Sequence, residues 1–250
     1  MKIGIIITSY GSIDQLVYHN HLSCFLAWSK EFETALYHMG DNQQEVSLNA
    51  MTLGALQDGC DYLFYAEHDN IYNKDTLRKL LANDLDIVTG NYNFRNWPFA
   101  PIPLKQDEEN GLMYRYECNV HDEEKEHNLF EVSLGCFGCC LVKADVLRKL
   151  FDKGLIFRRE YNKKTNGTYT ADVIFFKDAR DNGYKIWVDG AVKVGHQTKN
   201  LFVTPDNYKA YQMFLQLLYP EMVPEGERMP EDKRLSCVKK LLEEREECWI

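Results

Sequence analysis

The sequence has no uninterrupted apolar run near the roughly 20 residues that a membrane-spanning helix needs. We therefore expect no transmembrane segment. The N-terminal apolar run at residues 3–8 is short, and Gly11, Ser12 and Asp14 follow it without a small-residue cleavage site, which argues against a secretory signal. These absences favour a cytoplasmic protein whose first apolar run is a β-strand.

The sequence also lacks the cysteine content of a disulfide framework, and its 29 basic residues are outnumbered by 38 acidic ones. Eight cysteines in 250 residues are too few for a disulfide framework, so we expect reduced thiols. Cys136, Cys139 and Cys140 include a C-x-x-C spacing, but without a second pair nearby, buried thiols are favoured over a zinc site. A formal net charge of −9 disfavours a broad electrostatic contact with nucleic acid or anionic lipid. A phosphate-bearing ligand would need a metal ion or a few well-placed cations.

The sequence does contain β-rich apolar runs that alternate with helical patterns. Such alternation is typical of βαβ units, and it predicts an α/β fold with a mostly parallel central sheet flanked by helices. The predicted strands are residues 3–8, 34–38, 61–66, 86–89, 131–135, 139–143 and 185–188. The predicted helices are residues 13–28, 46–57, 74–82, 144–151, 171–182 and 206–219.

Three further segments have weaker patterns. Residues 93–110, with three prolines, and the basic residues 157–170 are expected to be loops, and loops of this length commonly serve a site. The charged, amphipathic residues 231–247 predict a helix packed on the domain. We expect one main domain over residues 1–205 and a C-terminal helical extension over residues 206–250 that packs on it.

The apolar run YLFYA leads directly into two carboxylates, Glu67 and Asp69. Side chains two apart on a strand point the same way, so both would project from the C-terminal end of the strand, where parallel sheets bind ligands. Two like charges this close repel each other unless a cation lies between them or one is protonated. A divalent cation is the common solution. The competing interpretation is an acidic cap before the helix at residues 74–82.

Four segments that together cover about residues 1–200 carry recognisable motifs: IGIIITSYGS, YLFYAEHDN, GCFGCCLVKADVL and ADVIFFKDARDNGYKIWVDGAVKVGH, in this order along the chain. Together they resemble a GT-A-fold glycosyltransferase similar to family 2. The fourth segment is the most specific, because it joins an acid-bearing helix, a strand and a histidine. The sequence has no Gln-x-x-Arg-Trp motif of processive synthases, so the resemblance implies transfer of one sugar at a time, with inversion as the expected outcome.

The resemblance implies a role for each residue that matches the family motifs. Asp69 matches the acid that holds the metal ion, and Glu67 matches the first acid of the Asp-x-Asp motif. His196 matches the histidine that completes the metal shell in many relatives. Asp172 matches the general base that takes the proton of the acceptor hydroxyl. Two departures bear on these roles: Glu67 replaces the usual aspartate, and Ala171 stands where many inverting relatives have a glutamate.

Five residues are expected to contact the donor: Thr8, Tyr10, Asp41, Lys199 and Glu67, which is also expected among the metal ligands. The resemblance implies the first three, which lie in or after the first two predicted strands. Lys199, just beyond the histidine motif, could add positive charge beside the diphosphate.

The expected ligands predict Mn²⁺ or Mg²⁺ as the cofactor. Carboxylate oxygens suit both ions, and an imidazole ligand favours Mn²⁺. We therefore expect a metal-dependent glycosyltransferase with a nucleotide-sugar donor and a glycan or other hydroxyl acceptor. Two alternatives stay open. One is a nucleotidyltransferase, although TSYGSIDQL lacks the Gly-rich basic loop of those enzymes; the other is a catalytically silent nucleotide- or carbohydrate-binding module.

Overall fold

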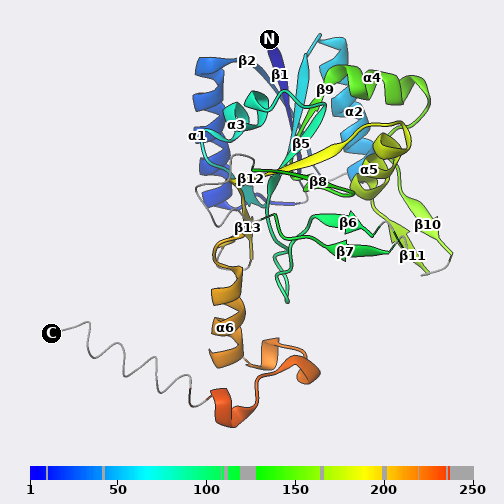
Figure 1. The fold of residues 1–250 in the computed structure, drawn as a ribbon. Helices are drawn as coiled ribbons and strands as arrows, with labels where there is room; N and C mark the ends of the chain where they lie inside the picture. Colours follow the sequence, from blue (N-terminus) through cyan, green and yellow to red (C-terminus); the bar gives the residue numbers. More distant parts are fainter. Residues whose placement is uncertain are drawn as a thin grey trace.

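Figure 1 shows a central sheet with helices on both faces and a C-terminal helix, α6, that extends below it. This computed structural model describes residues 1–9, 11–40, 43–107, 109, 112–118, 128–163, 166–198, 202–218, 220–234 and 236. None of the helices in these ranges is long and apolar enough to cross a bilayer.

Seven strands form the central sheet, in the order β2-β1-β3-β9-β5-β12-β8. In chain order they are β1 (Lys2–Ser9), β2 (Glu33–Gly40), β3 (Tyr62–Glu67), β5 (Ile87–Asn91), β8 (Leu129–Val132), β9 (Cys139–Lys143) and β12 (Ile186–Lys193). Each corresponds to a predicted strand, although β8 begins and ends earlier than residues 131–135.

The sheet is mixed, so the prediction of a mostly parallel sheet is wrong. Three neighbouring pairs are parallel, β1 with β2, β1 with β3 and β5 with β12. The other three, β3 with β9, β5 with β9 and β8 with β12, are antiparallel. A parallel connection needs a crossover, usually through a helix. The described residues between β5 and β9 form no helix, and β9 runs against both of its neighbours.

Five helices cover the two faces of the sheet, as predicted for an α/β fold. They are α1 (Gln15–Glu31), α2 (Gln44–Gln57), α3 (Thr76–Ala82), α4 (Ala144–Asp152) and α5 (Ala171–Asp181). One buried cluster joins α1 and α3 to the sheet, and another joins α2, α4 and α5 to the opposite face (Figure 1). Phe64 of β3 belongs to the first cluster and Tyr65 to the second. Because both faces are buried, the central strands consist of continuous apolar runs.

Three smaller sheets lie beside the main one. They are β4 (Asn70–Ile71) with β13 (Gly195–Gln197) and β14 (Phe202–Val203), β6 (Leu104–Gln106) with β7 (Met113–Arg115), and β10 (Glu160–Asn162) with β11 (Gly167–Tyr169). The prediction of structureless loops is therefore wrong in two places. Residues 157–170 contain the β10–β11 hairpin, and residues 93–110 contain β6. In both segments, main-chain pairing forms over three-residue strands that are too short for a hydrophobic period to reveal.

The C-terminal extension consists of α6 (Tyr208–Leu218) and two short 3₁₀ helices, η1 (Pro220–Met222) and η2 (Glu225–Glu227). A third buried cluster fixes it to the segment after β5, and its members are Phe99, Val203, Tyr208, Leu215 and Val223. Most of the predicted helix at residues 231–247 lies outside the described residues.

The described cysteines are all free and buried: Cys24, Cys60, Cys118, Cys136, Cys139 and Cys140. This agrees with the expectation of reduced thiols for these six. Cys237 and Cys248 lie outside the described residues. Burial raises the pKa of Cys139 to about 12, so this thiol stays protonated at neutral pH.

Candidate functional site

Asp69 and His196 meet at the C-terminal end of β3. The strand ends at Glu67, so Asp69 lies in the turn before β4. The prediction that Glu67 and Asp69 both project from one strand is wrong in this respect. Pairing of β4 with β13 places His196 opposite Asn70, and the N–H of Gln197 donates to the carbonyl of Asp69 (2.8 Å). As a result, Nε2 of His196 lies 3.4 Å from Oδ2 of Asp69.

The imidazole of His196 is also held from its other side. Nδ1 lies 2.8 Å from the carbonyl oxygen of Asn93, and the ring of Tyr92 contacts the imidazole edge-on, with 5.4 Å between centroids. A carbonyl oxygen only accepts, so Nδ1 carries a proton and Nε2 presents either a lone pair or a second proton to Asp69. Since a lone pair would repel a carboxylate, a cation or a proton between the two groups stabilises the contact.

Asp69 is the most strongly paired carboxylate of the site. It is 8% exposed, and Nη1 of Arg95 donates to its Oδ2 at 2.5 Å. Burial alone would raise the pKa of Asp69, but the hydrogen bond with His196 and the charges of His196 and Arg95 outweigh burial and hold the pKa below its ordinary value. Sequence reasoning missed Arg95, because no pattern in its segment shows which side chain turns towards the end of β3.

Glu67 and Asp172 belong to the same group of charges. Glu67 is the last residue of β3, and the parallel register places Thr8 of β1 beside it. Burial raises the pKa of Glu67 to about 7, and the negative charges of Asp69 and Asp172 add to the rise, while His196 opposes it. Asp172 lies in the first turn of α5. Thr8, Glu67, Asp69 and His196 thus lie at the same end of β3, and the charge of Asp172 acts on Glu67. The roles of these residues stay predictions.

The other predicted nucleotide contacts, Tyr10, Asp41 and Lys199, lie outside the described residues. Their roles stay predictions. The adjacent ends of β1 and β2 are described, and Oγ of Ser9 lies 2.9 Å from Nε2 of His38. This contact ties together the two strand ends from which Tyr10 and Asp41 follow.

Gly138 forms the floor of the site. Oη of Tyr72 donates to its carbonyl (2.6 Å), and its N–H donates to Oη of Tyr92 (2.9 Å). A Cβ at this position would lie 2.5 Å from Nδ2 of Asn70 and 2.6 Å from Oε2 of Glu67. No side chain fits in that space, so the glycine allows the backbone of the GCFGCC segment to approach the carboxylate closely.

Side chains of α1 fix the segment that follows Asp69. Nδ2 of Asn20 donates to the carbonyl of Tyr72, and the N–H of Tyr72 donates back to Oδ1 of Asn20, both at 2.9 Å. Nε2 of His21 lies 2.8 Å from the carbonyl oxygen of Asn70. Burial lowers the pKa of His21, so the neutral imidazole donates this bond. Sequence reasoning missed these contacts, because polar residues on a helix resemble a solvated face.

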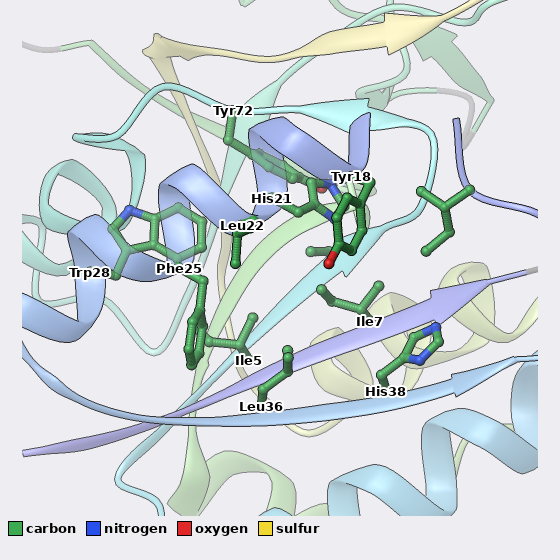
Figure 2. A pocket seen from close by; sticks show the side chains of 12 residues that line it. Ile5, Ile7, Tyr18, His21, Leu22, Phe25, Trp28, Leu36, His38 and Tyr72 are labelled. Carbon is green, nitrogen blue, oxygen red and sulfur yellow. The ribbon is translucent and has the colours of Figure 1, made fainter. Parts of the chain in front are cut away.

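A cavity of about 250 Å³ lies between α1 and the β1–β2 side of the sheet (Figure 2). Its lining is largely apolar and aromatic: Ile5, Ile7, Ile13, Tyr18, His21, Leu22, Phe25, Trp28, Leu36, His38, Ala66 and Tyr72. Ile7 and Ala66 directly precede Thr8 and Glu67 on their strands. The cavity thus lies next to the strand ends that carry the site. Its apolar lining does not suit the charged part of a ligand.

The predicted metal ligands are only partly assembled. Across the described ranges, no group of three or more His, Cys, Asp or Glu side chains is arranged to hold a metal ion. Asp69 and His196 provide two ligands, and Oδ1 of Asn70 is buried without a hydrogen-bond partner among the described residues. Carboxylate and amide oxygens are usual ligands of Mg²⁺ and Mn²⁺, whereas imidazole is more usual for Zn²⁺, Fe²⁺ and Ni²⁺. Mg²⁺ sites commonly combine one or two carboxylates with substrate phosphates, so an ion here would need further ligands such as a diphosphate, and Mn²⁺ or Mg²⁺ stays a prediction.

Comparisons with known proteins bear on the fold. No protein-family model matches the sequence, and no curated protein matches it. Among solved structures, the crystal structure of A197 from STIV matches with a TM-score of 0.53 and 17% sequence identity, over 82% of this chain and 91% of that chain. At this identity the likeness shows a shared fold alone, and function has to be argued from the site.

Proposed function

We propose that the protein is a metal-dependent, inverting glycosyltransferase with a GT-A fold, which moves one sugar from a nucleotide-diphosphate donor to an acceptor hydroxyl. The observation that carries this proposal is the contact between Asp69 and His196. The family resemblance implies one metal ion for these two residues, and their side chains lie 3.4 Å apart. The α/β fold and its likeness to A197 are consistent with this proposal.

Asp69 and His196 would hold Mn²⁺ or Mg²⁺, and the ion would stabilise the negative charge of the departing nucleoside diphosphate as a Lewis acid. Arg95 lies at the same point, with Nη1 2.5 Å from Oδ2 of Asp69. Its guanidinium group is half-exposed and can donate to a phosphate oxygen as well as to a carboxylate. Thr8 lies on the β1 side of this charge cluster, where the nucleotide would bind.

Asp172 would act on the acceptor. Asp172 lies in the first turn of α5, and its carboxylate can accept a proton from a hydroxyl within hydrogen-bond reach. In an inverting transfer, the acceptor oxygen forms a bond to the sugar carbon as the bond from that carbon to the diphosphate oxygen breaks. The hydroxyl proton passes to Asp172. Glu67, whose pKa is raised by the charges of both Asp69 and Asp172, would orient a hydroxyl or a bound water.

One observation favours a second function. The ion pair between Arg95 and Asp69 neutralises the carboxylate without any metal. A protein that keeps this pair when it binds a nucleotide sugar would be a catalytically silent binding module. Turnover separates the two functions.

The test combines binding with turnover. Thermal unfolding is followed with a panel of nucleotide sugars, with Mn²⁺ and with EDTA, because a ligand that binds only the native state raises its melting temperature. The same samples are assayed for free nucleoside diphosphate. We expect at least one donor to stabilise the protein in a Mn²⁺-dependent manner and to be hydrolysed slowly.

Asp69→Asn should abolish both the Mn²⁺-dependent shift and donor hydrolysis. Asp145→Asn removes an exposed carboxylate that pairs with Arg148 on α4 and should change neither. Full hydrolysis in Asp69→Asn, or in EDTA, would refute the mechanism. Donor binding without released nucleoside diphosphate would select the silent module.

A further inference from the structure

A second cleft, of about 890 Å³, adjoins the Asp69–His196 site. It lies between the segment after β5, the end of β13, and the C-terminal extension of α6, η1 and η2. The described residues that line it are Arg95, Asn96, Trp97, Phe99, Gln197, Thr198, Tyr211, Leu215, Met222, Val223, Pro224 and Arg228. Its volume lies in the range of about 300–1,000 Å³ that is usual for ligand pockets.

Two residues connect this cleft to the candidate active site. Arg95 lines the cleft and also donates to Asp69. Gln197 follows His196 on β13, and its N–H donates to the carbonyl of Asp69. A ligand in the cleft would therefore have one end beside the charge cluster of Glu67, Asp69 and His196.

An aromatic group forms one wall of the cleft. Phe99 is buried and contacts both Trp97 (6.1 Å between ring centroids) and Tyr211 (4.9 Å) edge-on. Nε1 of Trp97 donates to Oε2 of Glu227 (2.6 Å), which fixes the indole. Trp97 and Tyr211 are partly exposed. Rigid aromatic faces of this kind pack against the C–H face of a sugar ring.

The polar lining is of two kinds. Asn96, Gln197 and Thr198 carry amide and hydroxyl groups that can both donate and accept, as sugar hydroxyls do. Arg95 and Arg228 carry positive charge. None of the described lining residues is an aspartate or a glutamate, although the chain has a net charge of −9. This is the reverse of the general charge balance of the protein, and it selects a ligand with negative charge.

Arg228 is well placed to provide this selection. Its Nε donates to the carbonyl of Val223 (2.8 Å), which holds the side chain along the cleft wall. Within the described ranges, no carboxylate pairs with Arg228. The planar guanidinium group can bind a carboxylate or phosphate through two parallel hydrogen bonds.

We propose that this cleft binds a sugar that carries a carboxylate or phosphate group, and that this acidic sugar is the acceptor. The acceptor role rests on the proposed transferase function; the binding of an acidic sugar does not. The aromatic side chains contact the sugar ring, the amide and hydroxyl side chains bind its hydroxyls, and Arg228 binds the acidic group.

The test measures binding of three probes to the purified full chain by ligand-observed saturation-transfer NMR, without donor or metal: glucose 6-phosphate, glucuronate and glucose. We expect both acidic sugars to bind about tenfold more tightly than glucose, as one bidentate charged contact predicts. Arg228→Gln should remove this advantage, and Arg228→Lys should restore part of it. Arg148→Gln, which removes a half-exposed arginine on α4 that pairs with Asp145, should leave it unchanged. Because no turnover is measured, failure of the transferase function cannot mimic failure of this inference.

Three results would overturn the proposal. Equal affinity for glucose and glucose 6-phosphate would show that the cleft does not prefer a charged ligand. If inorganic phosphate bound as tightly as glucose 6-phosphate, the cleft would not recognise the sugar ring. A nucleoside diphosphate that loses affinity in Arg228→Gln as much as glucose 6-phosphate does would assign the cleft to the donor and not to the acceptor.

Discussion

Nε2 of His196 lies 3.4 Å from Oδ2 of Asp69, while Nδ1 of the same imidazole donates to the carbonyl of Asn93. Two pieces of backbone therefore set the distance between the predicted metal ligands: the β4–β13 pairing and the segment after β5. Substitutions that shift either one should change the site as strongly as substitutions of the ligands.

Asp172→Asn should lower kcat about 100-fold or more while leaving the donor KM nearly unchanged, because an amide cannot accept the hydroxyl proton. The measurement is steady-state transfer with a donor found in the thermal-shift panel. Asp181→Asn serves as control, since Asp181 lies exposed on the same helix and pairs with Lys177. Equal losses in both variants would show that α5 was perturbed and that Asp172 is not the base.

In metal-free protein, Glu67→Gln should reduce the dependence of stability on pH. The folded pKa is about 7, above the ordinary value of 4.5. Between these values the folded state holds more protons than the unfolded state, so wild-type stability falls as pH rises, by about 3 kcal/mol at most. Above the folded pKa the loss is complete. Urea unfolding in EDTA from about pH 4 to about pH 8 measures this slope. The control Glu131→Gln removes an exposed carboxylate and should show the same dependence of stability on pH as the wild type. An unchanged dependence in Glu67→Gln would contradict the raised pKa of Glu67.

Asn20→Ala should destabilise the protein by about 2 kcal/mol, because it leaves the N–H of Tyr72 without a partner and its carbonyl with only the weaker contact from Sγ of Cys24. Amide hydrogen exchange at Tyr72 should accelerate. Ser29→Ala, which removes an exposed hydroxyl from the same helix, should cost about 0.5 kcal/mol or less. If both variants lost the same stability, the contact between α1 and the segment after Asp69 would have no special role.

Gly138→Ala should destabilise the protein by about 1–3 kcal/mol through overpacking, since the new Cβ would lie 2.6 Å from Oε2 of Glu67. It should also abolish any Mn²⁺-dependent thermal shift. The matched control is Gly226→Ala, where no atom lies within 4 Å of the added Cβ. If Gly138→Ala kept wild-type stability, the side chains around Gly138 would be able to move aside for the added Cβ without cost.

The sequence predicts the strands and helices of the main domain well, because continuous apolar runs and helical periods reflect burial on one or two faces. It does not predict strand direction. The run at residues 139–143 has the same composition whether β9 is parallel or antiparallel to β3, and only the lack of a helical pattern between β5 and β9 could have indicated the reversal. The β4–β13 pair was missed because two- and three-residue strands carry no period.

For the site, the sequence predicts which charged residues follow the strands. The structure places Thr8 beside Glu67 and His196 beside Asp69, and the charge of Asp172 acts on Glu67. It does not predict their support. Arg95, Asn20 and His21 act through single contacts between distant segments. Such contacts follow no sequence period, so only the folded structure reveals them.

The position of β9 has a consequence for how the chain folds. β9 separates β3 from β5 in the sheet, yet it is synthesised after both of them. Until residues 139–143 leave the ribosome, β3 has an unpaired edge and β5 has no partner in the sheet, because β12 follows β9 in the chain. Insertion of β9 would join β3 to β5 and bring Gly138 against Glu67 in one step. Asp172 and His196 are synthesised after β9, so this wall of the site would form before they arrive.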